Sequence, residues 1–239
     1  MLKNIFIVAL LAGFVSGVGI SLVQEVTTTP LILQAETHEQ AEAPKASLHL
    51  AGFVQVHGTE ADGHDQSTAG EWGPANGLER FAYTTLANIV VGVGFALLLV
   101  ASYVIYGGQM SGRLGVIWGM AGYAIFVLLP SLGLSPEAPG SLAAELTARQ
   151  GWWLAAAGAT ALGLWLMVFC DGWLLRIAGI IVLAAPHILG APHPVEMGGP
   201  VPAELAARFA AASIVTAAIF WAMLGWLSGT LYQRTAAET

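Results

Sequence analysis

Residues 82 to 106 read AYTTLANIVVGVGFALLLVASYVIY, a run of 25 residues without a single charge. An α-helix rises about 1.5 Å per residue, so a bilayer core about 30 Å thick takes roughly 20 apolar residues. The run is apolar on every side rather than amphipathic, which is typical of a helix that lies between lipid and neighbouring helices. It therefore predicts a transmembrane helix.

Five more stretches share this character, and the fold class follows from their number. The predicted spans are residues 4–24, 82–106, 114–134, 151–170, 173–190 and 206–231. We expect an all-α membrane protein, a six-helix transmembrane bundle that forms a single domain over residues 1–239. The fifth stretch is short and holds Pro186 and His187 near its end, so five spans remain if it does not cross the membrane.

The composition agrees with a membrane location. Hydrophobic residues make up 56% of the 239 residues and charged residues 10%, whereas soluble domains carry about 25% charged residues. The mean hydropathy is +0.71. The net charge of −7 leaves no basic stripe for phosphates, which excludes nucleic-acid binding. The single cysteine, Cys170, excludes an intramolecular disulfide and a cysteine-rich metal cluster.

A signal peptide is the alternative interpretation of the first stretch, because Lys3 precedes a long apolar run. Nineteen uncharged residues from Ile5 to Val23 exceed the usual hydrophobic region of such a peptide, and no small-x-small cleavage site follows. We therefore expect this stretch to be retained as a span.

Small residues at four-residue spacing predict close helix packing within the bundle. The pairs are Gly13 with Gly17, Gly115 with Gly119, and Gly225 with Gly229. We interpret them as packing residues rather than as part of a transport path.

The charges that flank the spans predict the orientation, because basic residues concentrate in short cytoplasmic loops. If both termini are inside, the cytoplasmic segments carry four basic and two acidic residues, and the opposite side carries four basic and thirteen acidic residues. We therefore expect a multi-pass protein of a bacterial inner membrane with cytoplasmic N- and C-termini. Residues 25–79 then form an acidic, histidine-containing extracytoplasmic loop.

A repeated pattern divides the chain into three predicted helical hairpins. In each, an outward helix ends at a proline, a polar loop follows, and a Glu/Arg pair opens the inward helix. The prolines are Pro30, Pro130 and Pro186, and the pairs are Glu79 with Arg80, Glu145 with Arg149, and Glu204 with Arg208. Carriers often contain internal repeats and place their sites where repeats meet. Independent use of proline at helix ends and Glu/Arg at helix starts is the alternative interpretation.

Histidines and carboxylates gather in the predicted loop 25–79. Imidazole and carboxylate ligands suit borderline divalent ions such as Co²⁺, Ni²⁺ and Zn²⁺, and carboxylates attract any cation from outside. Four of the six histidines lie there: His38, His49, His57 and His64. Neither AETHEQAE nor EADGHDQ has a specific ligand spacing, so a solvated acidic loop is the alternative.

The string APHILGAPHP at residues 185–194 presents two imidazoles six residues apart. A polar group at the edge of a span is costly and is usually paired or functional. Glu137 holds the matching place in the second hairpin, and Glu36 follows the proline of the first. We therefore predict an outward-facing metal entry site. Its candidate ligands are His187, His193, Glu137, Glu36 and His38. The alternative is that His187 hydrogen-bonds a neighbouring helix end.

Other chemistries lack their motifs in this sequence. It contains no Gly-x4-Gly-Lys-Ser/Thr loop for ATP, no His-Glu-x-x-His and no Gly-x-Ser-x-Gly. A bis-histidine haem needs two facing intramembrane histidines, and His187 alone lies in a predicted span. We expect no enzyme activity and no prosthetic group.

Several phrases in a fixed order resemble the CbtA family of predicted cobalt transporter subunits over nearly the whole chain. They are TPLILQAE, GPANGLERFAYTTLANIVVGVGFALLL, LPSLGLSPEAPG, LTARQGWWLAAAGATALGL, APHILGAP and VPAELAARFAAASIVTAAIFWAMLGWLSG. The segment from about Ala41 to Ser67 has no counterpart in the family and looks like a local extension. The family is described with five spans rather than six.

The resemblance implies Co²⁺ import that supplies cobalamin biosynthesis, with Ni²⁺ as a possible second ion. It also implies a small single-span partner with a histidine-rich tail, resembling CbtB, and a homo-oligomer is possible. The alternative is a membrane metal sensor or a scaffold that transports nothing and presents a metal-binding loop to a partner.

Overall fold

The computed structural model describes residues 2–50, 73–194 and 199–237. The helices are α1 (Leu2–Val26), α2 (Thr29–Leu50), α3 (Leu78–Tyr106), α4 (Gly112–Tyr123), α5 (Leu129–Ser131), α6 (Leu146–Phe169), α7 (Trp173–Leu189) and α8 (Ala203–Ala237). A π-helical segment, η1 (Ala124–Leu128), joins α4 to α5. These ranges contain no strand, so the predicted all-α class is confirmed.

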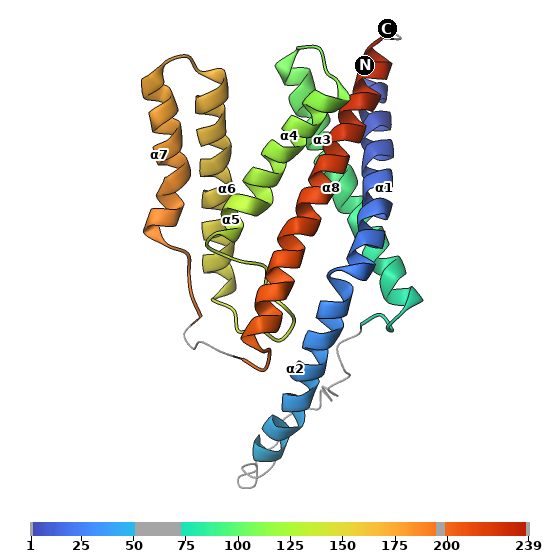
Figure 1. Ribbon diagram of the computed structural model, residues 1–239, viewed down its shortest axis with the longest axis vertical. Helices are drawn as coiled ribbons and strands as arrows, with labels where there is room; N and C mark the ends of the chain where they lie inside the picture. Colours follow the sequence, from blue (N-terminus) through green and yellow to red (C-terminus); the bar gives the residue numbers. More distant parts are fainter. Residues whose placement is uncertain (1, 51–72, 195–198, 238–239) are drawn as a thin grey trace, which may run out of the picture.

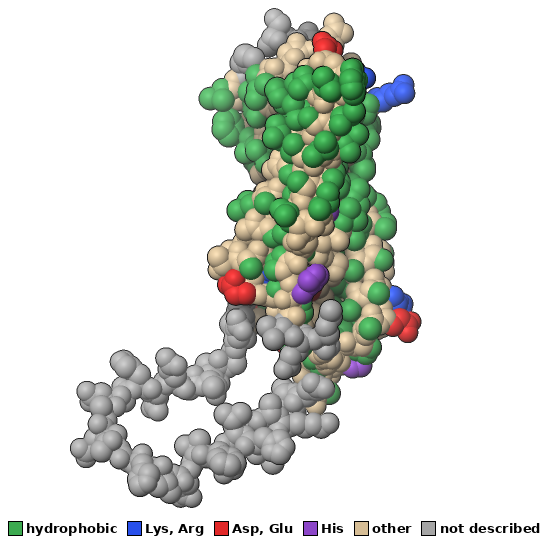
Figure 2. Space-filling view, turned by 90° about the vertical axis from the view of Figure 1, so that its left-hand side faces the viewer, with side chains coloured by type: hydrophobic (Ala, Val, Ile, Leu, Met, Phe, Trp, Pro, Cys, Tyr) green, Lys and Arg blue, Asp and Glu red, His purple; other side chains and the backbone are tan. Residues whose placement is uncertain are grey.

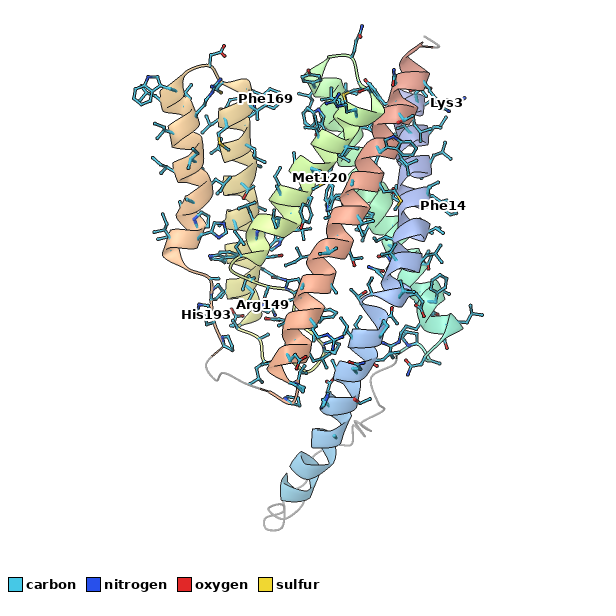
Figure 3. The ribbon with its side chains drawn as sticks, viewed as in Figure 1. Lys3, Phe14, Met120, Arg149, Phe169 and His193 are labelled. Atoms are coloured by element: carbon cyan, nitrogen blue, oxygen red, sulfur yellow. The ribbon has the colours of Figure 1, made fainter. Side chains whose placement is uncertain are left out.

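In the helix bundle α1, α4 and α7 run in one direction and α3, α6 and α8 run back, while α2 continues in the direction of α1 (Figure 1). α1 begins and α8 ends at the same end, which we call the terminal end. The opposite end, where α3, α6 and α8 begin, is the loop end. Lys3 lies at the terminal end, whereas Arg149 and His193 lie at the loop end (Figure 3).

Five of the described helical units are long and apolar enough to cross a membrane. They are α1, α3, the continuous α4–η1–α5 unit, α6 and α8. Hydrophobic side chains cover one flank of the bundle between charged side chains at both ends (Figure 2). The sixth predicted span, 173–190, falls on α7, which has 17 residues. That is about 25 Å of helix, less than the roughly 30 Å of a bilayer core. The chain is a membrane protein with several apolar helices.

Backbone contacts between glycines hold the long helices in pairs. A Cβ atom added at Gly13 would collide with the backbone of α3 at Val93, and one added at Gly115 would collide with the carbonyl oxygen of Gly225. Between lipid-facing helices such close approach replaces the hydrophobic drive of soluble proteins with van der Waals packing. The predicted packing role of the spaced glycines is therefore confirmed for the α1–α3 and α4–α8 pairs.

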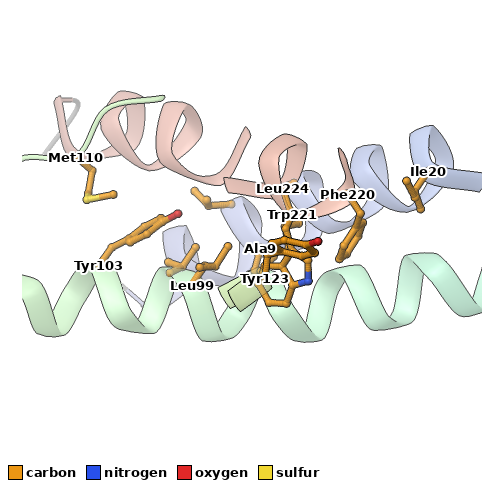
Figure 4. Packing of buried hydrophobic residues seen from close by; sticks show 13 residues of the cluster. Ala9, Ile20, Leu99, Tyr103, Met110, Tyr123, Phe220, Trp221 and Leu224 are labelled. Atoms are coloured by element: carbon orange, nitrogen blue, oxygen red, sulfur yellow. The ribbon is translucent and has the colours of Figure 1, made fainter. Parts of the chain in front are cut away.

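The main core lies where α1, α3, α4 and α8 meet (Figure 4). Trp221, Leu224 and Tyr103 are almost completely buried there. The Tyr103 hydroxyl and the Ser228 hydroxyl form a hydrogen bond of 2.9 Å, so these two buried polar groups satisfy each other within the core. These contacts pack the terminal half of the bundle tightly.

The predicted acidic segment 25–79 contains a helix that its composition does not predict, because residues 29–50 form α2. Pro30 stands in the first turn, where the absent N–H costs no hydrogen bond. Leu31 and Ala35, one helical turn apart, are buried against Ala138 and Leu205. Packing against the rest of the protein therefore stabilises a helix that the acidic composition of this segment does not predict. Residues 51–72, including His57 and His64, lie outside the described residues.

Two of the three repeat prolines lie inside helices rather than after them. The ring of Pro130 would clash with the carbonyl of Phe126 in a regular α-helix. The chain instead makes a π turn, in which the Leu129 N–H donates to the Ala124 carbonyl five residues earlier. Pro186 lies within α7, which ends three residues later at Leu189. The next residue, Gly190, caps the helix with a positive φ of 87°.

Candidate functional site

Two ion pairs lie at the loop end, and both contain residues that the sequence offers as metal ligands. Arg80 donates from Nη1 and Nη2 to the two carboxylate oxygens of Glu36 at 2.7 and 3.0 Å. Arg149 Nη2 donates to Glu137 Oε2 at 2.6 Å. All four side chains are between a quarter and a third exposed. Each candidate carboxylate is therefore neutralised by an arginine from the following long helix.

The ion pairs occupy equivalent places in the first two predicted hairpins. Glu36 follows Pro30 by six residues, and Glu137 follows Pro130 by seven. In the third hairpin the residue seven positions after Pro186 is His193, and it is exposed. The acidic position of the first two hairpins is thus taken by an imidazole in the third.

A cavity of about 620 Å³, the loop-end cavity, lies between α5, the chain that follows it and the first turns of α6. Glu137 and Arg149 line it on one side, and Phe126 and Trp153 line it on another. Glu145 caps α6 beside it, because its carboxylate accepts the N–H groups of Thr147 and Ala148 at 2.8 and 2.7 Å. These two hydrogen bonds lower the pKa of Glu145.

His187 lies on α7 against Trp152 of α6, with the two rings edge to face at 5.6 Å. Its Nε2 atom is buried and has no hydrogen-bond partner in the described part of the chain. The indole N–H of Trp152 donates to the Pro186 carbonyl at 3.3 Å, so the ring of Trp152 is fixed beside the histidine. The hydrogen bond to a neighbouring helix end, the alternative for His187, is not made by this atom.

The predicted ligands do not form one cluster. His38 is exposed on α2 and His193 is exposed after α7, while the two glutamates are held by their arginines. Within residues 2–50, 73–194 and 199–237 no group of three or more His, Cys, Asp or Glu side chains could hold a metal ion. These residues share the loop end, and the structure does not draw them into one coordination sphere.

A second cavity of about 320 Å³, which we call the polar chamber, lies between α1, α3 and α8 in the loop half of the bundle. Its polar lining consists of Gln24, Thr28, Asn88, Ser213 and Thr216. Asn88 Nδ2 donates to Ser21 Oγ at 2.9 Å and to Gln24 Oε1 at 2.6 Å. Neutral oxygen and nitrogen atoms therefore face one space inside an otherwise apolar bundle.

One residue in the sequence points to the polar chamber, although a search for His and carboxylate clusters does not find it. Asn88 interrupts the apolar run of α3, and a polar side chain within a span is usually functional or paired. Gln24 and Thr216 lie more than 190 positions apart in the chain, so their meeting depends on how α1 and α8 pack.

Aromatic side chains stand between the two cavities. Val127 lines both. Phe126, which the π turn presents, stacks on Trp221 with ring centroids 5.8 Å apart and an interplanar angle of 5°. Phe95 contacts both rings at 5.2 and 4.6 Å. This aromatic cluster, Phe95, Phe126 and Trp221, closes the cavities towards the packed terminal half.

Comparison with known proteins identifies one family. The sequence model of a family described as "Probable cobalt transporter subunit (CbtA)" matches residues 2–233, nearly the whole chain. No curated protein and no solved structure matches the chain.

Proposed function

Because this chain belongs to the CbtA family of probable cobalt transporter subunits, we propose that it is the membrane subunit of a Co²⁺ importer. The loop end faces the outside, and the terminal end faces the cytoplasm. The chain is a transporter subunit and not an enzyme, and Co²⁺ is its cargo.

The observation that carries this proposal is the placement of both cavities in the half of the bundle next to the loop end. Most lining residues of the two cavities come from the loop-side parts of their helices, and the polar chamber reaches mid-bundle at Phe95 and Trp221. The glycine contacts between α4 and α8, at Gly115 and Gly225, pack the terminal half. Glutamates outnumber arginines at the loop end, so the local field attracts cations. At the terminal end Arg113 and Arg176 flank short connections, which supports a cytoplasmic location.

Metal ions first meet the loop end at exposed imidazoles and partly exposed carboxylates. In our proposal His38 and His193 offer free nitrogen ligands, Glu36 and Glu137 attract the ion in exchange with their arginines, and His187 receives it beside Trp152. Such loose, successive ligands suit a transporter, because an ion must bind and also leave.

We propose that the membrane potential drives import. An inward-directed potential favours entry of a dication by about 4.6 kcal/mol per 100 mV, at about 2.3 kcal/mol per charge. We further propose that a small single-span, histidine-rich protein resembling CbtB delivers the ion, and that the imported cobalt supplies cobalamin biosynthesis.

Uptake of radiolabelled Co²⁺ into proteoliposomes tests the function directly. Vesicles that contain the chain, with and without the single-span partner, should accumulate Co²⁺ when the interior is negative. Protein-free vesicles are the control, and competition with Ni²⁺ measures selectivity. Metal binding without uptake in both preparations would support a sensor or scaffold instead.

Substitution of His187 tests the entry route. His187→Ala should reduce the initial uptake rate far more than His49→Ala, because His187 has a buried, unpartnered nitrogen beside the loop end. Equal effects of the two substitutions, or no effect of either, would refute the assignment.

A further inference from the structure

The polar chamber has a hydrogen-bond arrangement that leaves acceptor oxygens unused. The Thr27 hydroxyl donates its proton to the Val23 carbonyl at 2.7 Å. Thr216 must therefore be the donor in the 3.3 Å contact between the Thr27 and Thr216 hydroxyls. Thr216, a residue that is 3% exposed, thus accepts no hydrogen bond at its hydroxyl oxygen from a described residue.

Asn88 shows the same surplus of acceptors. Both hydrogens of its amide nitrogen are used, one by Ser21 and one by Gln24. Its carbonyl oxygen, Oδ1, receives no hydrogen bond from a described residue. The oxygens of Thr216 and Asn88 thus keep lone pairs that no hydrogen bond within the described residues uses, and they line the chamber, so they are available to accept from or coordinate a ligand.

The acceptors that line the chamber are neutral and hard, which defines the class of ligand. Carboxamide and hydroxyl oxygens coordinate hard or borderline cations either directly or through the water molecules of a hydration shell. The chamber volume of about 320 Å³ exceeds the roughly 180 Å³ that six waters occupy at about 30 Å³ each. None of the lining residues is charged, so a cation would bind weakly and keep most of its water.

We propose that the polar chamber is an intramembrane binding site for a hydrated divalent cation, held by the oxygens of Asn88, Thr216 and Gln24. The site rests on the proposed function and names the position where the cargo pauses inside the bundle. The aromatic cluster of Phe95, Phe126 and Trp221 stands on its cytoplasmic side. The cation therefore waits in the chamber until these rings separate.

Transport assays of a conservative apolar substitution test the role of the site. Asn88→Leu keeps the size of the side chain and removes its oxygen, so Co²⁺ uptake should fall about tenfold, the effect of losing one interaction of ordinary strength. Ser102→Ala is the matched control on the same helix, because the Ser102 hydroxyl bonds its own helix at Leu98. Wild-type uptake by Asn88→Leu would overturn the proposal.

A spectroscopic test locates the cation without measuring transport. In a Cys170→Ala background, Asn88→Cys places a thiol in the chamber, and a thiolate bound to Co²⁺ gives a charge-transfer band in the near ultraviolet. We expect that band with Asn88→Cys and not with Ser102→Cys. If the wild-type protein transports Co²⁺ but Asn88→Cys gives no band, the site is wrong and the function stands. If the band appears but no preparation transports Co²⁺, the site stands and the proposed function is wrong.

Discussion

At the scale of single residues, Arg80 and Arg149, in the first turns of α3 and α6, form ion pairs with glutamates that precede these helices in the chain. The spacing of Glu145 and Arg149 predicts a pair within one helix, yet Arg149 binds Glu137 and Glu145 caps α6. Arg80 likewise binds Glu36 of α2 rather than its neighbour Glu79. The two carboxylates that the sequence predicts as metal ligands, Glu36 and Glu137, are thus each paired with an arginine.

Removing the arginine should therefore strengthen the attraction of the loop end for Co²⁺. Arg149→Gln frees Glu137 beside the loop-end cavity, so the Co²⁺ concentration for half-maximal uptake should fall by up to about fivefold, as expected for a partly exposed pair of about 1 kcal/mol. The control is Arg208→Gln, since Arg208 is exposed on α8 and makes no ion pair with a described residue. Weaker binding in Arg149→Gln would show that the pair itself is needed.

At the scale of elements, the carboxylate cap of α6 links helix stability to pH. The hydrogen bonds from Thr147 and Ala148 lower the pKa of Glu145 below its ordinary value of 4.5. A carboxylate with a lowered pKa stabilises the folded protein fully above that ordinary value, and its contribution disappears as the pH falls further through the folded pKa.

Thermal unfolding in detergent between pH 3 and pH 7 checks this expectation. Glu145→Gln should lower the melting temperature at neutral pH and reduce the loss of stability on acidification. Glu204→Gln is the control, because Glu204 lies in the first turn of α8 and its carboxylate makes no hydrogen bond with a described residue. Parallel melting curves of wild type and Glu145→Gln over the whole pH range would contradict the role of the cap.

The glycine contacts predict different costs for the same substitution at two positions. Gly115→Ala places a methyl group against the Gly225 carbonyl, so the free energy of unfolding should fall by about 1–3 kcal/mol. Gly94→Ala meets no atom within 4 Å and should be neutral or stabilising, since alanine favours a helix more than glycine does. Unfolding in mixed detergent micelles measures both, and equal losses would refute the packing argument.

At the scale of the whole molecule, the direction of transport depends on which end faces the cytoplasm. With a Cys170→Ala background, a membrane-impermeant maleimide added to intact cells should label Glu60→Cys and not Arg113→Cys. Deletion of residues 46–69 should leave membrane insertion intact, because that segment adds no span. Labelling of Glu60→Cys only after lysis would place the acidic side in the cytosol and reverse the proposed import.

Much of the fold could be predicted from the sequence because the bilayer imposes a simple rule on it. A run such as 82–106 must be helical, since every backbone group in lipid needs an internal hydrogen bond. α2 and the π turn could not be predicted in this way. α2 depends on Leu31 and Ala35 finding partners on other elements, and the π turn depends on how the helix accommodates Pro130.

The candidate site, like the fold, could be predicted from the sequence only in part. The sequence by itself determined the apolar spans, the excess of acidic residues on one side and the supply of imidazoles and carboxylates, because these follow from composition and order along the chain. Only the tertiary structure decided that Glu36 and Glu137 face arginines, and that Gln24, Asn88 and Thr216 share one chamber. Side chains from distant helices meet because of the register in which the helices pack. Close backbone contacts at glycines set that register, and it cannot be read from a short stretch of sequence.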